Sequence, residues 1–477
     1  MRGTAGAVLL TAGLSAGCAT NPATGEREIS LIGEGQEVQM GQESDPQIIA
    51  SMGLYQDDAV QQYVNQLGQR LAAASERPDL PWTFRVIDDP TVNAFAVPGG
   101  FIYVTRGLMA HMTSEAQLVG VLGHEIGHVT ARHSVSQMSR QQLAQIGLGI
   151  GMILSPQLAQ LGDLAGAGLQ VLFLKYSRDN ENEADELGVR YMRRVNYEPT
   201  QLAEVMATLE RVSAEAESSG RVPEWLSTHP NPPNRVANIL EAARATEAEA
   251  SGTPTIRRAE YMRQLDNMVF GLNPREGYFE DNLFLHPDMR FRFEFPSGWQ
   301  TVNQKQAVQG ISGQQDAMIA LTAAEGTPQQ ALQQFGSQQG LQMGSARSTT
   351  VNGLPAATAE FMATTEQGNL RGVVLFVAHN NMTFQLLGYT PEPSWNGYAQ
   401  TLTRSLGSFA PLTDRVALAK QPKRMDVVTV PSSMTLATFM QRYPSVEEPQ
   451  VVALINQIQG DARLSSGTLY KRVVAGR

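Results

Sequence analysis

Apolar residues recur with a helical period in the first half of the chain. Between residues 57 and 74 they return every three or four positions, which predicts an amphipathic helix with one buried face. The same spacing predicts helices over residues 34–51, 179–195 and 200–217. The apolar stripe of the 57–74 helix consists of Val60, Tyr63, Val64, Leu67 and Leu71.

Short segments with strand character lie between and after these helices. Residues 82–87 alternate apolar and polar side chains, and the Pro-Gly-Gly sequence at 98–100 separates two further strand-like segments as a hairpin turn would. Beyond residue 290 three phenylalanines alternate, and Asn380-Asn381 separates two more such segments. These patterns predict an α+β protein whose first domain is mainly helical with a small β-sheet.

The length of the chain predicts several domains. Its 477 residues are too many for one hydrophobic core. We expect a mainly helical domain over residues 33–284, a small α+β domain over residues 285–412 and a third module over residues 415–477. The small α+β domain is weakly similar to PsbP-type folds, and its sequence contains no residue cluster typical of catalysis, so its role is open.

One further predicted helix carries two histidines and a glutamate. They form an H-E-x-x-H pattern from His124 to His128, in which both imidazoles lie on one helix face and can reach a single metal ion. Glu125 lies beside them, where it can accept a proton from water. Four of the seven histidines fall between His111 and His133, so a chance match on a solvated helix is the weaker interpretation.

A second helical segment offers carboxylates that complete such a site. Glu181 and Asp185 are four residues apart and therefore share a helix face. One carboxylate can complete the coordination while the other holds a ligand histidine by a hydrogen bond. Taken alone, Glu181 would be an ordinary solvated acid. Together the two motifs favour a catalytic site with one Zn2+ per chain.

These motifs, in this order, resemble the zinc metallopeptidase family that includes HtpX, the CAAX prenyl proteases and the periplasmic BepA and LoiP proteins. The resemblance covers about residues 20–285. It implies a gluzincin-type fold and endopeptidase activity for this domain. Besides the two motifs, the segments that carry it are residues 93–102, residues 107–109 and the Ser-Thr-His-Pro sequence at 227–230, with Arg235 six residues past the histidine.

The resemblance also assigns ligands and a general base. It implies that His124, His128 and Glu181 bind zinc, and that the fourth position stays open for water. Glu125 then takes a proton from the attacking water and passes it to the leaving amine. Asp185 orients one of the ligand histidines.

Two residues of the second motif have more than one interpretation. His229 and Arg235 are candidates to stabilise the oxyanion. His229 can instead occupy the open zinc position and switch the enzyme off. The remaining alternative is a His-Pro turn that caps a helix, with Arg235 on the surface.

The strand ahead of the zinc helix is a candidate substrate-binding element. An exposed edge strand can bind an extended peptide by main-chain hydrogen bonds, so Asn93, Ala94, Phe95 and Ala96 are predicted to bind substrate. That they are simply packed strand residues is an equal alternative. The apolar, Gly-rich segment 141–174 predicts either a mobile lid over the cleft or a buried helical hairpin.

The N-terminus resembles a bacterial lipoprotein signal. Residues 1–17 contain an apolar segment that is too short to span a bilayer and suits a signal peptide. The residues around Cys18 resemble a lipobox, although Ser15 stands where leucine is usual, and this implies lipidation of Cys18 and a tether over residues 18–32. An ordinary cleaved signal with a spare cysteine is the alternative.

Charge and cysteine content limit the partners and the location. The formal net charge of −10 argues against nucleic-acid binding. The single cysteine excludes an internal disulfide. The resemblance to the lipoprotein signal implies a periplasmic protein with a lipid anchor, and by family analogy Ala19 after Cys18 implies the outer membrane. The resemblance to the metallopeptidase family implies unfolded or misassembled envelope proteins as partners.

The third module differs from the rest of the chain in charge. Residues 415–477 contain nine basic and four acidic residues. The order of predicted elements, which starts with a strand at 426–430, resembles a LysM-like module and implies peptidoglycan as a partner. The expected Gly-Asp before the first threonine is absent, so a plain packing module is an equal alternative.

A binding protein is the competing hypothesis for the whole chain. In that case a chaperone-like or assembly factor carries a latent zinc site, and residues 285–477 supply the function. A purely structural zinc fits poorly, because structural sites are usually closed by four protein ligands, often cysteines, and Cys18 is the only cysteine.

Overall fold

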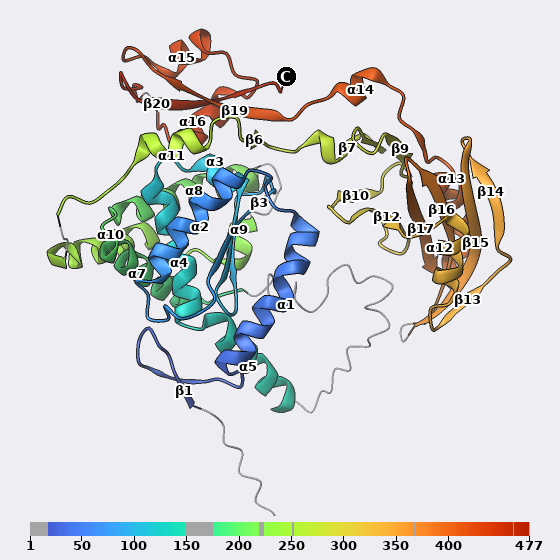
Figure 1. Ribbon diagram of the computed structural model, residues 1–477, viewed down its shortest axis with the longest axis horizontal. Coiled ribbons are helices and arrows are strands. Elements are labelled where there is room, and N and C mark those ends of the chain that lie inside the picture. The colour runs from blue at the N-terminus through green and yellow to red at the C-terminus, as the bar shows by residue number, and fades with distance from the viewer. Residues whose placement is uncertain are drawn as a thin grey trace, which may run out of the picture.

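The computed structural model describes most of the chain, namely residues 18–147, 175–218, 224–249, 252–365, 368–460 and 462–476 (Figure 1). The predicted signal peptide and nearly all of the predicted lid lie outside these residues. Helices and several separate sheets make up the described part, which confirms the predicted α+β class. Among its helices, none has both the length and the apolar character needed to cross a membrane.

Helices form most of the first domain. α2 buries Val60, Val64, Leu67 and Leu71, the stripe that the sequence predicts, while Tyr63 is half-buried at its margin. The helices of this domain are α1 (Glu34–Met52), α2 (Asp58–Ala72), α3 (Arg106–His111), α4 (Glu115–Thr130), α5 (His133–Gly147), α7 (Arg178–Arg194), α8 (Thr200–Ser218), α9 (Glu224–Thr228), α10 (Arg235–Ala245) and α11 (Arg258–Gln264).

A three-stranded sheet lies between α1 and the other helices. Its order is β3 (Thr83–Ile87), β5 (Phe101–Thr105) and β4 (Ala94–Val97), with β3 parallel and β4 antiparallel to β5. The turn between β4 and β5 needs positive φ at Gly99 and Gly100, +86° and +96°, which glycine adopts without strain. One face of the sheet packs on α1, and the other joins the main helical core.

α4 lies at the centre of this core, and all of its residues are buried. It begins where the Ser114 side chain accepts a hydrogen bond from the Gln117 amide. α7 packs closely against it through glycines, since a Cβ on Gly188 would lie 3.1 Å from the His124 amide nitrogen. This close approach places the carboxylates of α7 beside the histidines of α4.

The second domain is built on antiparallel sheets. Its larger sheet has eight strands, in the order β10-β11-β12-β17-β16-β15-β13 with β14 paired to β15, and a four-stranded sheet has the order β18-β9-β8-β7. Two helices, α12 (Pro328–Gly336) and α13 (Trp395–Leu406), pack against the larger sheet. The smaller sheet starts at Tyr278, earlier than the expected boundary at residue 285. The strands are β7 (Tyr278–Glu280), β8 (Leu283–His286), β9 (Phe291–Glu294), β10 (Gln300–Asn303), β11 (Ala307–Ile311), β12 (Met318–Ala324), β13 (Leu341–Met343), β14 (Arg347–Val351), β15 (Leu354–Thr365), β16 (Gly368–His379), β17 (Met382–Pro391) and β18 (Ala410–Pro411).

The third module is packed against the first domain rather than separated from it (Figure 1). Its strand β19 (Lys423–Thr429) pairs with both β20 (Leu469–Val474) and β6 (Val269–Phe270), and β6 follows α11 of the first domain. The buried Nζ of Lys471 donates hydrogen bonds to the carbonyls of Ala110 (2.8 Å) and Met112 (2.6 Å), at the end of α3. The other elements of the module are α14 (Arg415–Ala419), α15 (Leu436–Arg442) and α16 (Pro449–Ile455).

The predicted tether has a defined structure close to the first domain. Its strands β1 (Cys18–Thr20) and β2 (Arg27–Ile29) form an antiparallel hairpin. After the hairpin, the Leu31 amide donates to Ser139 Oγ on α5 at 3.0 Å. The chain is therefore fixed to the first domain before α1 begins.

Candidate metal centre

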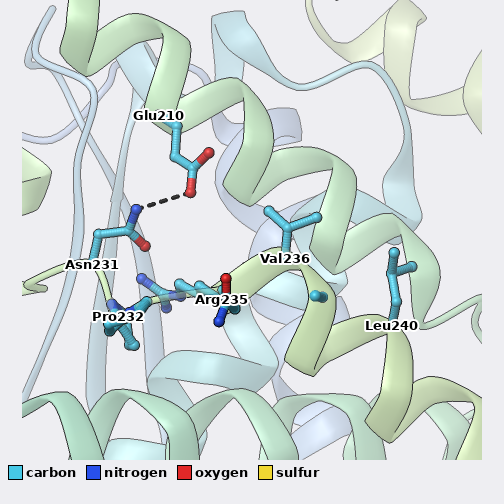
Figure 2. Close-up of a pocket in the computed structure, with 9 residues that line it drawn as sticks. Glu210, Asn231, Pro232, Arg235, Val236 and Leu240 are labelled. Carbon is cyan, nitrogen blue, oxygen red and sulfur yellow. Dashed lines mark hydrogen bonds between the residues drawn. The ribbon is translucent and has the colours of Figure 1, made fainter.

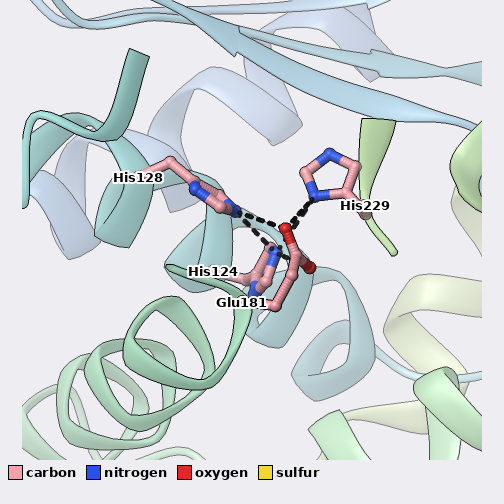
Figure 3. Close-up of side chains that lie close together, drawn as sticks. All are labelled: His124, His128, Glu181 and His229. Carbon is pink, nitrogen blue, oxygen red and sulfur yellow. Dashed lines mark hydrogen bonds and ion pairs between the residues drawn. The ribbon is translucent and has the colours of Figure 1, made fainter. Parts of the chain in front are cut away.

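Four buried side chains from three parts of the chain meet beside α4. His124 and His128 come from α4, Glu181 from the first turn of α7, and His229 follows α9 directly (Figure 3). Each offers one ligand atom, and these atoms all lie within 4.8 Å of one another. The structure thus brings together the three predicted zinc ligands and adds the predicted histidine of the second motif.

The possible ligand atoms of the cluster lie close enough to one another to bind a single metal ion. Nε2 of His124 lies 3.0 Å from Nε2 of His128. The Glu181 carboxylate reaches both, with Oε1 3.4 Å from His128 Nε2 and Oε2 3.6 Å from His124 Nε2. Nδ1 of His229 lies 3.1 Å from Glu181 Oε1.

The electrostatics of the cluster suit a metal. Burial works to raise the pKa of Glu181, but His229 and His128 outweigh it and hold that pKa well below its ordinary value. Burial also holds the pKa of His128 well below its ordinary value. An ionised carboxylate and a neutral imidazole are the forms that bind metal. Glu181 Oε2 makes no hydrogen bond with the described residues and has an ion pair with Arg235 beside it. Two histidines and a carboxylate are a donor set that fits a zinc ion.

Asp185 and Arg235 support the cluster from one side. His124 Nδ1 donates to Asp185 Oδ1 at 2.9 Å. Arg235 donates to both oxygens of Asp185, at 2.8 and 2.9 Å, and its Nη2 lies 3.2 Å from Glu181 Oε2. Arg235 is 2% exposed, which contradicts the alternative that Arg235 lies on the surface.

Glu125 is placed differently from the other acids. It is fully buried on α4, and neither of its oxygens has a hydrogen-bond partner among the residues that the structure describes. Burial is the main cause that raises its pKa above the ordinary value. Its Oε1 lies 3.7 Å from His229 Nε2. A carboxylate with a raised pKa and free lone pairs is suited to accept and return a proton near neutral pH.

Two aromatic rings hold the histidines in place, and sequence reasoning missed both. Trp225 stacks on His229 with ring centroids 4.2 Å apart and planes 15° apart. Tyr176 stacks on His128 at 3.9 Å and 18°. The spacing of Trp225 and His229, four residues apart, was a signal for the first contact.

His133 and Glu183 also went unassigned in the sequence. His133 Nδ1 lies 2.9 Å from Nδ1 of His128, and its Nε2 lies 3.3 Å from Glu183 Oε2. The concentration of histidines before residue 134 was the available signal for His133. Nothing in the spacing of the chain pointed to Glu183.

The strand predicted to bind substrate lies at the edge of its sheet. β4 pairs only with β5 in the described structure. The side chains of Asn93, Ala94, Phe95 and Ala96 are nevertheless all buried, at 7% exposure or less. Their side chains are therefore packed, and only the main-chain edge of β4 remains as a site for an extended peptide.

A hollow of about 520 Å³ lies next to the second motif (Figure 2). On one side of it, Asn231 donates to Glu210 of α8 at 2.8 Å. None of the four clustered side chains lines this hollow. The lining residues are Glu210, Asn231, Pro232, Pro233, Asn234, Arg235, Val236, Ala237 and Leu240.

Comparison with known proteins finds relatives of the part of the chain that carries the cluster. Residues 58–243 match the sequence profile of peptidase family M48. The chain is 36% identical over 235 residues to the beta-barrel assembly-enhancing protease of Escherichia coli (strain K12), covering 47% of each protein. It is 33% identical over 186 residues to the mitochondrial metalloendopeptidase OMA1 of Schizosaccharomyces pombe, covering 38% of this chain and 52% of that protein. The chain spans about half the length of the curated relatives it matches.

A solved structure also matches part of the chain. The solution structure of cyanobacterial PsbP from Synechocystis sp. PCC 6803 covers 28% of this chain and 94% of its own, at 16% identity and a TM-score of 0.24. A TM-score of this size supports no conclusion, so the similarity of residues 285–412 to PsbP-type folds stays a prediction.

Proposed function

We propose that this chain, whose residues 58–243 match the sequence profile of peptidase family M48, is a zinc-dependent endopeptidase. The proposal rests on the buried cluster of His124, His128 and Glu181, with Glu125 on the same helix as the two histidines. Bound there, zinc would polarise the scissile carbonyl and lower the pKa of the attacking water.

Glu125 is the proposed general base. It takes the proton from the attacking water and delivers it to the nitrogen of the leaving amine. Its two unpartnered oxygens and its raised pKa support both transfers. Asp185 is a positioning residue, because its hydrogen bond at 2.9 Å to Nδ1 of His124 leaves Nε2 of that ring for the metal.

His229 has two proposed roles, as a fourth metal ligand or as a group that stabilises the oxyanion, and its contacts favour the first. Its Nδ1 lies 3.1 Å from Glu181 Oε1 and 3.5 Å from His124 Nε2, which favours a fourth ligand that closes the site in this conformation. Movement of His229 away from Glu181 would open the site, and the side chain could then stabilise the oxyanion. Arg235 donates to Asp185 and lies beside Glu181, which supports a positioning role rather than contact with substrate.

The proposed substrates are misfolded or stalled proteins of the bacterial envelope. The similarity to a beta-barrel assembly-enhancing protease supports this class. An extended peptide would add to the main-chain edge of β4 at Asn93–Ala96. We further propose a lipid anchor on Cys18, with the outer membrane as location, and a LysM-like identity for residues 415–477.

The test compares cleavage of casein by the wild-type chain and by Glu125→Gln, with zinc content measured on both. Loss of the base is expected to lower the rate by about 10²–10⁴-fold while zinc stays bound. Glu186→Gln, which neutralises an exposed acid on α7, is the matched control and keeps full activity.

Other outcomes distinguish the alternatives. If neither protein cleaves although zinc is bound, His229→Ala separates a self-inhibited enzyme, which becomes active, from a binding protein, which does not. A folded wild-type protein that takes up no zinc would refute the proposal.

A further inference from the structure

A continuous path of hydrogen bonds leads from the metal centre to the N-terminal hairpin. His128 Nδ1 lies 2.9 Å from His133 Nδ1, and His133 Nε2 lies 3.3 Å from Glu183 Oε2. The other oxygen of Glu183 accepts a hydrogen bond of 3.1 Å from Asn21 Nδ2. Four residues from three separate parts of the chain thus form one hydrogen-bonded series, which we call the file. His133, inside it, is 1% exposed.

Metal binding at His128 fixes the direction of every bond in this file. His128 turns Nε2 toward the cluster, so with a metal on Nε2 its only proton is on Nδ1. That proton can only be donated to Nδ1 of His133, which must then carry its own proton on Nε2. The Nε2 proton is donated to the carboxylate of Glu183. The file therefore admits one tautomer of each ring, and it ends on an anion that increases the basicity of the ligand.

The hairpin presents Asn21 in a fixed orientation. Asn21 Oδ1 accepts from the amides of Ala23 (2.9 Å) and Thr24 (3.3 Å), inside the turn between β1 and β2. Its own amide donates to Glu26 O at 2.7 Å. With Oδ1 occupied by the turn, Nδ2 is the end of the side chain that faces Glu183, and Asn21 is only 2% exposed.

We propose that the N-terminal hairpin, residues 18–29, is a working part of the metal centre. Asn21 holds Glu183, Glu183 holds His133, and His133 orients the ligand His128. These three are positioning residues, since none of them contacts the proposed reacting atoms. The inference rests on the proposed function, because it requires a metal on His128.

Zinc affinity tests this proposal without relying on activity. Metal-free full-length protein is titrated with zinc in competition with a chromophoric chelator, and with cobalt(II), whose absorption spectrum reports the ligand geometry. The variants are Glu183→Gln and Asn21→Ala. The matched controls are Glu186→Gln, which removes the same charge from an exposed position of α7, and Thr24→Ala, which alters an exposed residue of the same turn.

Glu183→Gln is expected to weaken zinc binding by about 10–100-fold and to change the cobalt spectrum, while both controls match the wild type. Asn21→Ala is expected to weaken binding by a smaller factor, and to have no further effect once Glu183→Gln is present, because the two act in one file. Asn21→Ala lies outside the helical core and keeps the test available if Glu183→Gln does not fold.

Equal zinc affinity for Asn21→Ala, Glu183→Gln and the two controls would overturn the inference and leave the proposed function intact. Additive effects of Asn21→Ala and Glu183→Gln would also overturn it, since they would mean two independent roles. Failure of the wild type to bind zinc would instead refute the proposed function, and the inference with it.

Discussion

The metal centre and the second domain bury opposite kinds of side chain. Beside α4 and α7 the buried cluster is ionisable. Its members pair with one another through ion pairs and hydrogen bonds, whereas Glu125 has no hydrogen-bond partner among the described residues. The core of the second domain is aromatic and aliphatic, and among the described residues no further group of potential metal ligands is found there. Its buried phenylalanines are Phe284, Phe291, Phe293, Phe295, Phe335, Phe361, Phe376, Phe384 and Phe409.

This difference has an energetic consequence. A buried charge is stable only while its partners remain, and removal of one partner leaves an uncompensated charge in a region of low dielectric. An apolar core loses only the contacts of the atoms removed and accepts many substitutions of similar volume. The metal centre should therefore respond to changes of single atoms that the second domain would tolerate.

The largest expected effect comes from Asp185→Asn. The change removes the charge that pairs with Arg235 and weakens the acceptor for His124. Breaking such a buried pair costs about 3–5 kcal/mol of the free energy of unfolding, and zinc affinity should fall by about 10–100-fold. Chemical denaturation and zinc competition measure the two losses.

Asp179→Asn is the control for this prediction. It makes the same chemical change at an exposed position of the same helix, and it should alter neither quantity. If Asp185→Asn behaved like Asp179→Asn, the buried ion pair would contribute nothing to the centre.

A smaller effect concerns acidification of the second domain at His286. Burial lowers the pKa of His286 from 6.5 to about 4, and its Nδ1 accepts a hydrogen bond from the Met289 amide at 3.2 Å. Between these two pKa values the unfolded chain binds more protons than the folded chain. Stability is therefore complete above pH 6.5 and falls as the pH drops toward 4, by about 2 kcal/mol between pH 7 and pH 5.

Hydrogen exchange of the amides in β8 and β9 at the two pH values would measure this loss. His286→Asn keeps an acceptor for the Met289 amide and does not titrate in this range. The stability that this variant loses between pH 7 and pH 5 should be smaller than the loss in the wild type by about 2 kcal/mol. Parallel pH profiles for the two proteins would contradict the assigned role of His286.

The last prediction concerns two glycine-to-alanine changes that should shift the free energy of unfolding in opposite directions. At Gly188 a Cβ would meet the backbone of α4 at 3.1 Å, so Gly188→Ala should cost about 1–3 kcal/mol by overpacking and should weaken zinc binding. Gly397, inside the exposed face of α13, has nothing within 4 Å of a built Cβ. There the same change should stabilise the second domain by about 0.5–1 kcal/mol. Chemical denaturation of both variants measures the two changes in the free energy of unfolding. Changes of the same sign would contradict the proposed difference between the two regions.

The sequence predicted those features that depend only on neighbouring residues in the chain. The α2 stripe, the turn at Gly99-Gly100 and the shared face of His124 and His128 follow from period and spacing alone. The contacts of Glu183 with His133 and Asn21 could not be predicted, because they join residues far apart in the chain through the packing of the hairpin on α7. For Asn93–Ala96 the sequence left substrate binding and packing as equal alternatives, because α1 covers one face of the sheet and the main helical core the other, and both positions depend on tertiary contacts.

The contact of Lys471 with the end of α3 sets an order of events when the chain is made. The carbonyls of Ala110 and Met112 are synthesised long before the ammonium that they bind. At a usual rate of roughly 5–20 residues per second, the delay is on the order of tens of seconds. Until β19 is made, β6 lacks the strand that pairs with it, and until Lys471 is made the carbonyls of Ala110 and Met112 lack the donor that binds them in the folded chain. The domain that carries the metal centre therefore reaches its complete form only after Lys471 has been added.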